Sequence, residues 1–373
     1  MGEFDGLRVL EIGHFHYAKW RRPAETTLVW CGMTAPPAEH LAVSFFTLPG
    51  ILWRLAAGRD DLVIVYVEQW APWHWKHLRR LVSPRPDRVL AKLALVQLLR
   101  FVRVKAPLMV IDLTEWGFIH RYNEFLLGKA RYWFKRELPL DRWRVFRRSA
   151  GGGLPASRFR RNPANRRRLE ALRPLSLGCV PPREVLAAAP REKTADVFVA
   201  VAGWGSATVR DEGLRALAGL GEGVVVDRPT TRLDLAAYYE RMAGAWLTWS
   251  PYGFGADCFR HYEAPLAWSV PLIPRLPFVR QYPLIEGVHC VYYDPDDPDG
   301  LAAAAQRALA DKDRLQRMAA AARELVIAHH LWPDRIDALI RMGLGREAPP
   351  GGFAFDERSA EPPPASSGLS SRP

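Results

Sequence analysis

The sequence predicts an α/β protein of two domains, in which short buried strands alternate with helices. Its 373 residues exceed the roughly 100–200 residues that a single domain usually holds. Hydrophobic residues make up 49% of the chain and charged residues 25%, a balance that supports packed cores and excludes general disorder. The alternation of strand-like and helix-like segments occurs in both halves of the chain, which favours two layered domains.

The first half contains four apolar or β-branched runs that are typical of buried strands. They are residues 7–12, 27–30, 62–67 and 108–113. Between them, residues 36–57, 73–81 and 89–104 have apolar side chains at three- and four-residue spacing, which suits helices that cross over a parallel sheet. Residues 149–165 contain three successive glycines and clustered arginines, so we expect a loop there.

The second half predicts the same alternation more clearly. The expected strands are residues 197–201, 224–227, 245–249, 270–274 and 290–293. The expected helices are residues 211–220, 233–242, 258–268, 299–310, 313–330 and 332–342. We therefore divide the chain into a first domain, a linker, a second domain, a closing helix and a disordered tail. These parts span residues 1–175, 176–194, 195–330, 331–345 and 346–373.

The net charge of +12 is concentrated between residues 76 and 173, where arginines occur in runs such as Arg166-Arg167-Arg168. Such a region attracts nucleic acid, an anionic membrane surface or phosphorylated small molecules, or it is simply a solvated face. The longest apolar run, residues 89–104, is interrupted by three cations, so we expect no membrane span, and we expect no signal peptide before it. We expect a cytoplasmic protein, with peripheral contact to the inner membrane face as an option. The four cysteines form no C-x-x-C pair, so neither a zinc site nor a disulfide framework is encoded.

The stretch from Ser250 to Pro274 has the strongest chemical signal. A Gly-rich turn, Gly253-Phe254-Gly255, lies between an expected strand and an expected helix. Glycines let the backbone approach a ligand closely, and the free N–H groups of a helix N-terminus favour a phosphate. Ligands collect at this end of the strands in open α/β sheets. The stretch therefore predicts a site for a phosphorylated ligand.

The same residues resemble the donor-binding motif of group 1 glycosyltransferases with the GT-B fold. In that motif, Gly-Phe-Gly is followed by a Glu-Ala pair, a helix and a Gly-x-Pro-x-Ile strand. This chain has Gly253-Phe254-Gly255, Glu263-Ala264 and then Val270-Pro271-Leu272-Ile273. The resemblance to the family extends to other parts of the chain, namely residues 193–202, 233–241 and 247–251 and the closing helices with Arg323 and Trp332. The family includes glycosyltransferases that are grouped with spore-coat maturation proteins.

This resemblance implies two Rossmann-like domains that face each other across a cleft. The second domain would bind a nucleotide-sugar donor, and the first would present a glycan, a lipid-linked molecule or a small-molecule acceptor. It also implies transfer with retention, no cofactor and no metal. The aspartate-rich residues 294–299 read as a turn cluster and not as a metal site.

The motif departs from the family pattern at its first carboxylate. In the family a glutamate immediately precedes Gly-Phe-Gly, eight positions before the second glutamate. Here Tyr252 has that place, eleven positions before Glu263, and Gly255 lies at the usual spacing. Asp257 is the nearby acid that could substitute: it would contact the donor sugar, or alternatively cap the following helix.

For Glu263 the family implies hydrogen bonds with the two ribose hydroxyls of the nucleotide. The alternatives are that it stabilises its own helix or pairs with Arg260. Arg210 is placed like the family's phosphate-binding arginine, and Arg260 is a second candidate, unless it forms a surface salt bridge. The loop with Gly203 and Gly205 after the first strand of the second domain is a weaker donor-binding signal.

Other candidates carry less weight. His261 would contact a phosphate or sugar, or else be packed. His14 and His16 follow the first strand, where an acceptor-side base or oxyanion donor would lie. Asp112 and Glu115 end another strand, and the aromatic residues 70–75 would stack on sugar rings or pack in a core or interface.

The predicted function is transfer of a sugar from a nucleotide sugar to an unknown acceptor. One alternative is a degenerate protein that binds sugar nucleotides without turnover, because the first motif glutamate is missing. A second is a nucleic-acid-binding protein that uses the arginine-rich region, although only charge supports it and we expect no nucleic acid partner.

Overall fold

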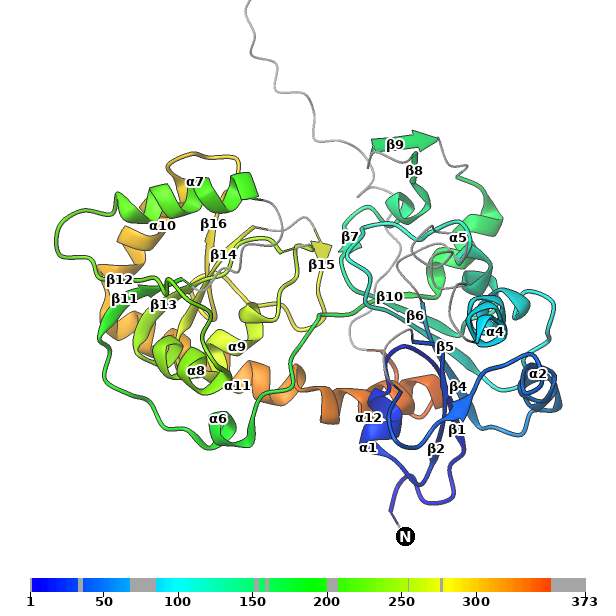
Figure 1. Ribbon diagram of the computed structural model, residues 1–373. Coiled ribbons are helices and arrows are strands. Elements are labelled where there is room, and N and C mark those ends of the chain that lie inside the picture. Colours follow the sequence, from blue (N-terminus) through cyan, green and yellow to red (C-terminus); the bar gives the residue numbers. More distant parts are fainter. Residues whose placement is uncertain are drawn as a thin grey trace, which may run out of the picture.

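The computed structural model describes residues 2–32, 36–67, 85–150, 154–157, 161–199, 207–253, 255–275 and 278–349. Two parallel sheets, each with helices on both faces, form two bodies that lie next to each other (Figure 1). The predicted α/β class is confirmed. Each sheet is the core of one Rossmann-like domain.

The first sheet has seven strands in the order β10-β6-β5-β4-β1-β2-β3, and all its pairs are parallel. Alternate side chains of β1 and β4 enter different cores, as expected for a strand buried on both faces. One core is covered by helices α2 and α4, and the other by α1 and α12. The strands are β1 (Val9–Gly13), β2 (Thr26–Trp30), β3 (Leu41–Ala42), β4 (Leu62–Tyr66), β5 (Leu108–Asp112), β6 (Tyr132–Lys135) and β10 (Leu172–Pro174). The helices are α1 (Tyr17–Arg21), α2 (Leu48–Ala57), α4 (Pro86–Leu98) and α12 (Trp332–Leu344).

The second sheet has five parallel strands in the order β12-β11-β13-β14-β16. Helices α7 and α10 pack on one of its cores, α8 and α9 on the other, and the long α11 contributes to both. The strands are β11 (Ala195–Phe198), β12 (Val226–Asp227), β13 (Ala245–Trp249), β14 (Val270–Pro274) and β16 (Val291–Tyr293). The helices are α7 (Ala207–Ala218), α8 (Leu235–Ala243), α9 (Arg260–Leu266), α10 (Gly300–Leu309) and α11 (Lys312–His329).

The last helix, α12, leaves the second domain and packs on the first (Figure 1). Its Trp332 ring stacks on Tyr17 of α1 with 4.0 Å between centroids, and its Ile336 and Ile340 are fully buried against β4 and β5. A Cβ at Gly343 would come within 2.8 Å of Leu62 Cδ1, so the helix lies close against the sheet. The residues that follow α11 therefore complete the core of the first domain.

The four strands predicted in the first half and the five predicted in the second all have counterparts in the structure. The helix predicted over residues 36–57 is wrong in its first part, because α2 begins only at Leu48. The Thr47 hydroxyl donates to Ala42 O (2.8 Å) and accepts from Ser44 N (2.9 Å), local bonds that compete with a helix. Residues 41–42 instead form the edge strand β3.

The loop predicted over residues 149–165 is also partly wrong. β8 (Arg148–Ala150) and β9 (Leu154–Ser157) pair as an antiparallel hairpin, and α5 (Pro163–Glu170) follows. The Asn162 side chain accepts from Asn165 N at 2.8 Å and Pro163 occupies the first turn, so α5 begins with two standard start signals. The helix predicted over 73–81 lies outside the described residues, as does the tail from residue 350. Among the described helices, none combines the length and the apolar character needed to cross a bilayer.

Candidate functional site

The Gly-rich loop lies at the carboxyl end of β13, where a parallel sheet places its ligands. Within it, Gly253 N donates to Gly255 O (2.9 Å), and the Cys258 thiol contacts the carbonyls of Pro251 and Gly255 at 3.5 and 3.7 Å. The loop is thus closed on itself. Phe254, and the predicted donor-binding Gly203 and Gly205, lie outside the described residues, as do the aromatic residues 70–75.

Glu263 lies in the first turn of α9 and is directed toward α8. The Tyr238 hydroxyl of α8 donates to Glu263 Oε2 at 2.8 Å. Among the described residues, Oε1 has no hydrogen-bond partner and no cation forms an ion pair with this carboxylate. Burial raises the pKa of Glu263, while the bond from Tyr238 and the charge of Arg260 oppose the rise. The site therefore has a fixed carboxylate with one acceptor oxygen available, and the pairing with Arg260 considered above is not formed.

Two arginines lie near the Gly-rich loop, Arg210 on α7 and Arg260 at the start of α9. Arg210 on α7 is buried and donates from Nη2 to the carbonyl of Tyr252 at 3.4 Å. Burial above all, and then the charge of Arg260, lower the pKa of Arg210. Within the described part of the chain, Arg260 forms no salt bridge, and its Nε is buried without a hydrogen bond. Guanidinium groups near a Gly-rich loop are the kind of side chain that binds a diphosphate.

Ser250, the first residue of the loop, is completely buried. Its hydroxyl has no partner among the described residues. A buried hydroxyl without a protein partner is uncommon in folded proteins.

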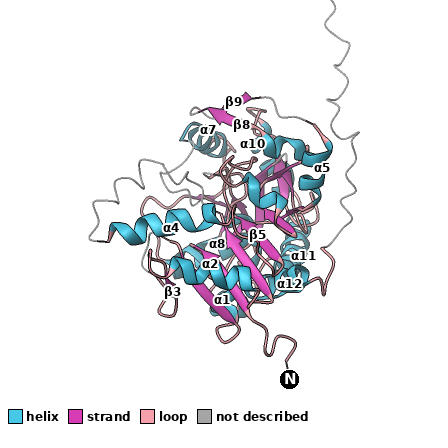
Figure 2. Ribbon diagram, turned by 90° about the vertical axis from the view of Figure 1, so that its right-hand side faces the viewer, coloured by secondary structure: helices cyan, strands magenta, loops and turns pink. Residues whose placement is uncertain are grey.

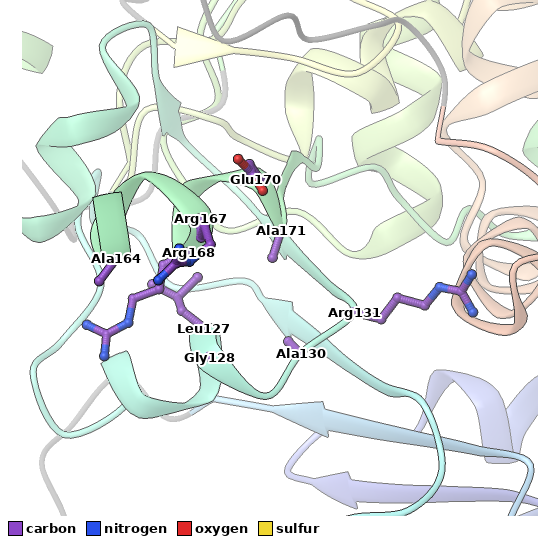
Figure 3. Close-up of a pocket in the computed structure, with 9 residues that line it drawn as sticks. All are labelled: Leu127, Gly128, Ala130, Arg131, Ala164, Arg167, Arg168, Glu170 and Ala171. Atoms are coloured by element: carbon purple, nitrogen blue, oxygen red, sulfur yellow. The ribbon is translucent and has the colours of Figure 1, made fainter. Parts of the chain in front are cut away.

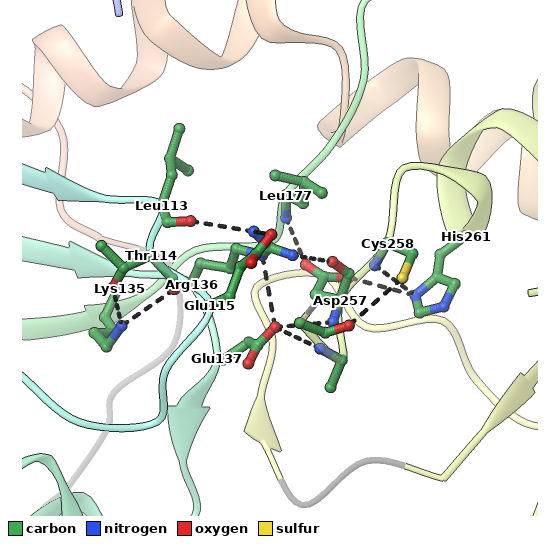
Figure 4. A network of polar contacts seen from close by, with 12 residues as sticks. Leu113, Thr114, Glu115, Lys135, Arg136, Glu137, Leu177, Asp257, Cys258 and His261 are labelled. Carbon is green, nitrogen blue, oxygen red and sulfur yellow. Dashed lines mark hydrogen bonds and ion pairs between the residues drawn. The ribbon is translucent and has the colours of Figure 1, made fainter. Parts of the chain in front are cut away.

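The far side of the same loop is bound by the first domain (Figure 4). Glu137 Oε1 accepts from the backbone N–H groups of Ala256 (2.7 Å) and Asp257 (3.1 Å). Arg136 Nη2 donates to the carbonyl of Asp257, and Arg136 Nη1 donates to Leu113 O and contacts Glu115 at 3.4 Å. Arg136 and Glu137 lie in the turn after β6, and Leu113 and Glu115 lie in the segment after β5. We refer to the contacts of Arg136, Glu137 and Asp257 as the interdomain latch.

Asp257 is the most densely bonded carboxylate of the latch. It accepts from Leu177 N (2.6 Å) and from the Tyr262 hydroxyl (2.8 Å), and Arg280 and His261 lie at 3.5 and 3.4 Å. Burial alone would raise the pKa of Asp257, but Arg280, His261 and Arg136 outweigh it and hold the pKa well below its usual range. The carboxylate is therefore ionised and buried between the domains.

This placement corrects one prediction about Asp257. It does not cap α9, because the N-cap residue is Phe259 and no side chain bonds there. Its predicted contact with a donor sugar stays a prediction, and its oxygens already accept from protein donors. His261, considered above as a ligand contact, is fully buried beside Asp257, and burial above all lowers its pKa to about 4.

The comparisons with known proteins concern the fold. No protein-family model matches the chain, and no curated protein matches it either. Among solved structures, HepE from Anabaena bound to UDP matches with a TM-score of 0.52 at 12% identity, over 91% of this chain and 100% of that one. HepE bound to UDP-glucose matches with a TM-score of 0.52 at 11% identity, again over 91% and 100%. A glycosyltransferase from Rickettsia africae matches with a TM-score of 0.51 at 8% identity, over 92% and 100%.

The chain has the GT-B fold. The expectation drawn from the Gly-Phe-Gly motif is therefore confirmed for the fold. In this GT-B chain, Glu263 and Arg260 lie on α9 just after the motif, and Arg210 on α7 donates to Tyr252 O in the loop; their roles in donor binding stay predictions. The structure adds Tyr238, which the sequence reading did not single out although it lies within a stretch that resembles the family.

In the first domain, Asp112 and Glu115 have different surroundings. Asp112 is buried and bonded to Trp133 Nε1 (3.1 Å), Thr114 N (3.0 Å) and Lys135 Nζ (3.3 Å), so it holds the sheet end together. Glu115 contacts the latch through Arg136. His14 and His16 follow β1 and are half-buried, and their rings contact Phe15 (4.4 Å) and Trp30 (5.8 Å).

The loop that carries His14 is held by the buried Glu11 of β1. Its carboxylate accepts from Ala18 N (2.9 Å), Lys19 N (2.8 Å) and the Tyr66 hydroxyl (2.9 Å). Burial raises the pKa of Glu11 from 4.5 to about 7, although these three donors and the charge of Lys19 oppose the rise. The loop after β1 is thus anchored by an acid that titrates near neutral pH.

We expect Glu11→Gln to flatten the pH dependence of stability. A raised carboxyl pKa means that the native state holds the proton more tightly, so stability falls as the pH rises through the interval between 4.5 and about 7. Across that interval, the free energy of unfolding of the wild type should fall by about 3 kcal/mol more than that of the variant. Urea unfolding at the two ends of the interval measures this, with Glu192→Gln, at an exposed site, as the control. Equal slopes for wild type and Glu11→Gln would contradict it.

A hollow of about 550 Å³ lies on the first domain, between α5 and the short helix Glu124–Gly128. Arg167 and Arg168 line it, and Figure 3 shows Arg131 extending away from them toward the C-terminal helix. Arg168 bonds Asn165 at 3.2 Å. Arg167 and Arg168 belong to the basic region for which an anionic partner was considered above. The hollow shares no lining residue with the Gly253–Glu263 loop.

Proposed function

We propose that this protein is a glycosyltransferase that moves a sugar from a nucleotide-sugar donor to an acceptor. The observation that carries the proposal is the set of Glu263, Arg210 and Arg260 at the carboxyl end of the second sheet. A carboxylate can accept hydrogen bonds from the hydroxyls of a ribose, and guanidinium groups can bind a diphosphate. The GT-B fold and the UDP and UDP-glucose complexes of HepE support this assignment.

In the proposed reaction, Glu263 Oε1 accepts hydrogen bonds from the ribose hydroxyls while Tyr238 holds Oε2. Arg210 and Arg260 bind the diphosphate and stabilise the charge that develops on it as the bond between the sugar anomeric carbon and the phosphate oxygen breaks. The acceptor oxygen forms the new bond to that carbon, and its proton passes to the leaving diphosphate. The transfer proceeds with retention, without a metal and without a protein nucleophile.

The acceptor is proposed to lie on the side of the first domain, near the loop after β1 that carries His14. Because the acceptor's own proton passes to the diphosphate, His14 would act there as a hydrogen-bond donor to an acceptor oxygen. A glycan, a lipid-linked molecule or a small molecule would satisfy this arrangement. Closure of the two domains would exclude water from the donor.

The proposal is tested by a thermal-shift panel of nucleoside diphosphates and nucleotide sugars, beginning with UDP and UDP-glucose. A true ligand at about 100 times its dissociation constant stabilises the protein by about 2.7 kcal/mol. We expect Glu263→Ala to weaken its binding by about ten- to a hundredfold, because hydrogen bonds to a charged group contribute roughly 1.5–3 kcal/mol. Tyr238→Phe should weaken binding less, because it only frees the carboxylate.

Glu240→Ala, at an exposed glutamate of the neighbouring α8, is the matched control and should bind like the wild type. If no member of the panel stabilises the protein, the proposed function is wrong. If stabilisation survives Glu263→Ala undiminished, the ribose assignment is wrong. Release of the nucleoside diphosphate on prolonged incubation separates an enzyme from a protein that binds sugar nucleotides without turnover.

A further inference from the structure

Helices α2 and α4 cover the same face of the first sheet and leave their outer sides uncovered by any other described element. Their inner side chains, Leu48, Ile51 and Leu55 on α2 and Ala91 and Leu95 on α4, are buried in one core with the sheet. Both helices lie in front of the strands in Figure 2, which views the molecule from the side of this face. What the helices and their flanking turns expose therefore forms one surface, which we call the α2–α4 face.

Large aromatic side chains project from the α2–α4 face. Phe46, in the turn before α2, is 92% exposed, and Phe101, just after α4, is 81% exposed. Trp53, on α2, is 57% exposed. Phe45 and Leu90 are also exposed. Single exposed apolar residues are ordinary, but several on one face indicate an interaction surface.

The charges on the α2–α4 face are mostly positive. Residues 41–59 contain no aspartate or glutamate, and residues 85–105 contain six lysines and arginines against the single acid Asp87. The six are Arg85, Arg88, Lys92, Arg100, Arg103 and Lys105. The acid that follows α2, Asp60, is buried and bonded to Arg54. The face therefore carries an excess of positive charge.

The cations and aromatics are interleaved. The Arg59 guanidinium lies over the Trp53 ring at 4.3 Å from its centroid. Lys105 N donates to Leu55 O (3.3 Å), which joins the segment after α4 to the end of α2. Lys105 thus lies near the end of α2, and the cations Arg59, Arg103 and Lys105 are all exposed.

We propose that the α2–α4 face docks on an anionic phospholipid surface. Such a surface offers hydrocarbon to Phe46, Trp53 and Phe101 and phosphate groups to the surrounding cations, which is the pairing that peripheral membrane proteins use. A protein partner would favour a centre depleted of charge, unlike the interleaved cations here. A nucleic acid would use the cations but would leave aliphatic side chains such as Leu90 without an apolar partner.

The test is sedimentation of the full-length protein with phosphatidylcholine vesicles, with and without phosphatidylglycerol. We expect binding only to the anionic vesicles, and weaker binding as salt screens the charges. Replacing Phe46, Trp53 and Phe101 together by serine should lower partitioning at least about tenfold. Replacing Arg59, Arg103 and Lys105 by glutamine should lower it roughly fivefold for each cation removed.

Matched controls alter exposed residues of the second domain, and they should bind vesicles like the wild type. The apolar control replaces Val225, Leu235 and Ile327 by serine, and the charge control replaces Arg215, Arg307 and Arg317 by glutamine. No binding to anionic vesicles, or equal loss in the control variants, would overturn the proposal. So would oligonucleotide binding that the face variants lose while vesicle binding persists. Vesicle binding needs no nucleotide, so its result is independent of the proposed sugar transfer.

Discussion

Replacing Asp257 by asparagine is expected to lower the free energy of unfolding by about 3–5 kcal/mol, because the change removes one partner of a buried ion pair. Arg280 is buried, and its Nε and Nη1 have no hydrogen-bond partner among the described residues. Without Asp257, its charge would remain in the interior with no carboxylate in contact. Urea unfolding at neutral pH measures the loss.

Two further variants sharpen this prediction. Asp211→Asn makes the same change at an exposed position of α7 and should alter stability by less than about 0.5 kcal/mol. The double variant Asp257→Asn with Arg280→Met should be more stable than Asp257→Asn alone, since both charges are then removed. If the free energy of unfolding lost by the double variant equals the sum of the losses of Asp257→Asn and Arg280→Met alone, the two side chains are not coupled, and the ion pair does not explain the effect of Asp257→Asn.

Replacing Arg210 by alanine is expected to reduce the kcat/KM of sugar transfer about a hundred- to a thousandfold, as the loss of one preorganised donor to a developing anion usually does. The guanidinium is buried and held toward the Gly-rich loop by the Tyr252 carbonyl. Because its charge would meet the diphosphate, binding of the nucleoside diphosphate should weaken while binding of the bare nucleoside is unchanged. Calorimetry with both ligands measures this difference.

Arg215→Ala is the control for Arg210→Ala, since Arg215 lies on the same helix and is exposed. Arg210→Lys should retain part of the diphosphate binding, because the charge remains while the planar fork is lost. Equal weakening of nucleoside and nucleoside diphosphate would show that the substitution disturbs the site as a whole, and the phosphate role would then be wrong.

The sequence predicts the two α/β domains well because their strands are continuous apolar runs. Runs such as residues 62–67 and 245–249 are buried on both faces, so their pattern is local and readable. β6 and β10 were not predicted. Their segments carry Lys135 and Arg173, and a charged residue within a short strand conceals the pattern.

The sequence locates the Gly-rich loop correctly. The structure shows a further reason why one of its residues, Gly255, is a glycine. A Cβ at Gly255 would overlap Glu137 Oε1 and Arg136 Nη2, so a glycine is needed where the first domain approaches the loop. Nothing near Gly255 in the sequence indicates this. The partners of Asp257 lie 80 and 121 residues away, at Leu177 and Arg136, and such contacts are set by the tertiary fold. Glu137 itself adopts φ of 55°, a conformation that no neighbouring residue signals.

The position of α12 bears on the order in which the chain matures during synthesis. Domains generally fold as units as they leave the ribosome, beginning with the N-terminal one. Here the core of the first sheet needs Trp332, Ile336 and Ile340, which are among the last described residues to be made. Until they emerge, the part of β4 and β5 that α12 covers stays exposed, and the core of the nascent first domain is incomplete until nearly the whole chain is made. A translation product that stops before residue 332 would expose that face and be a target for chaperones and proteases.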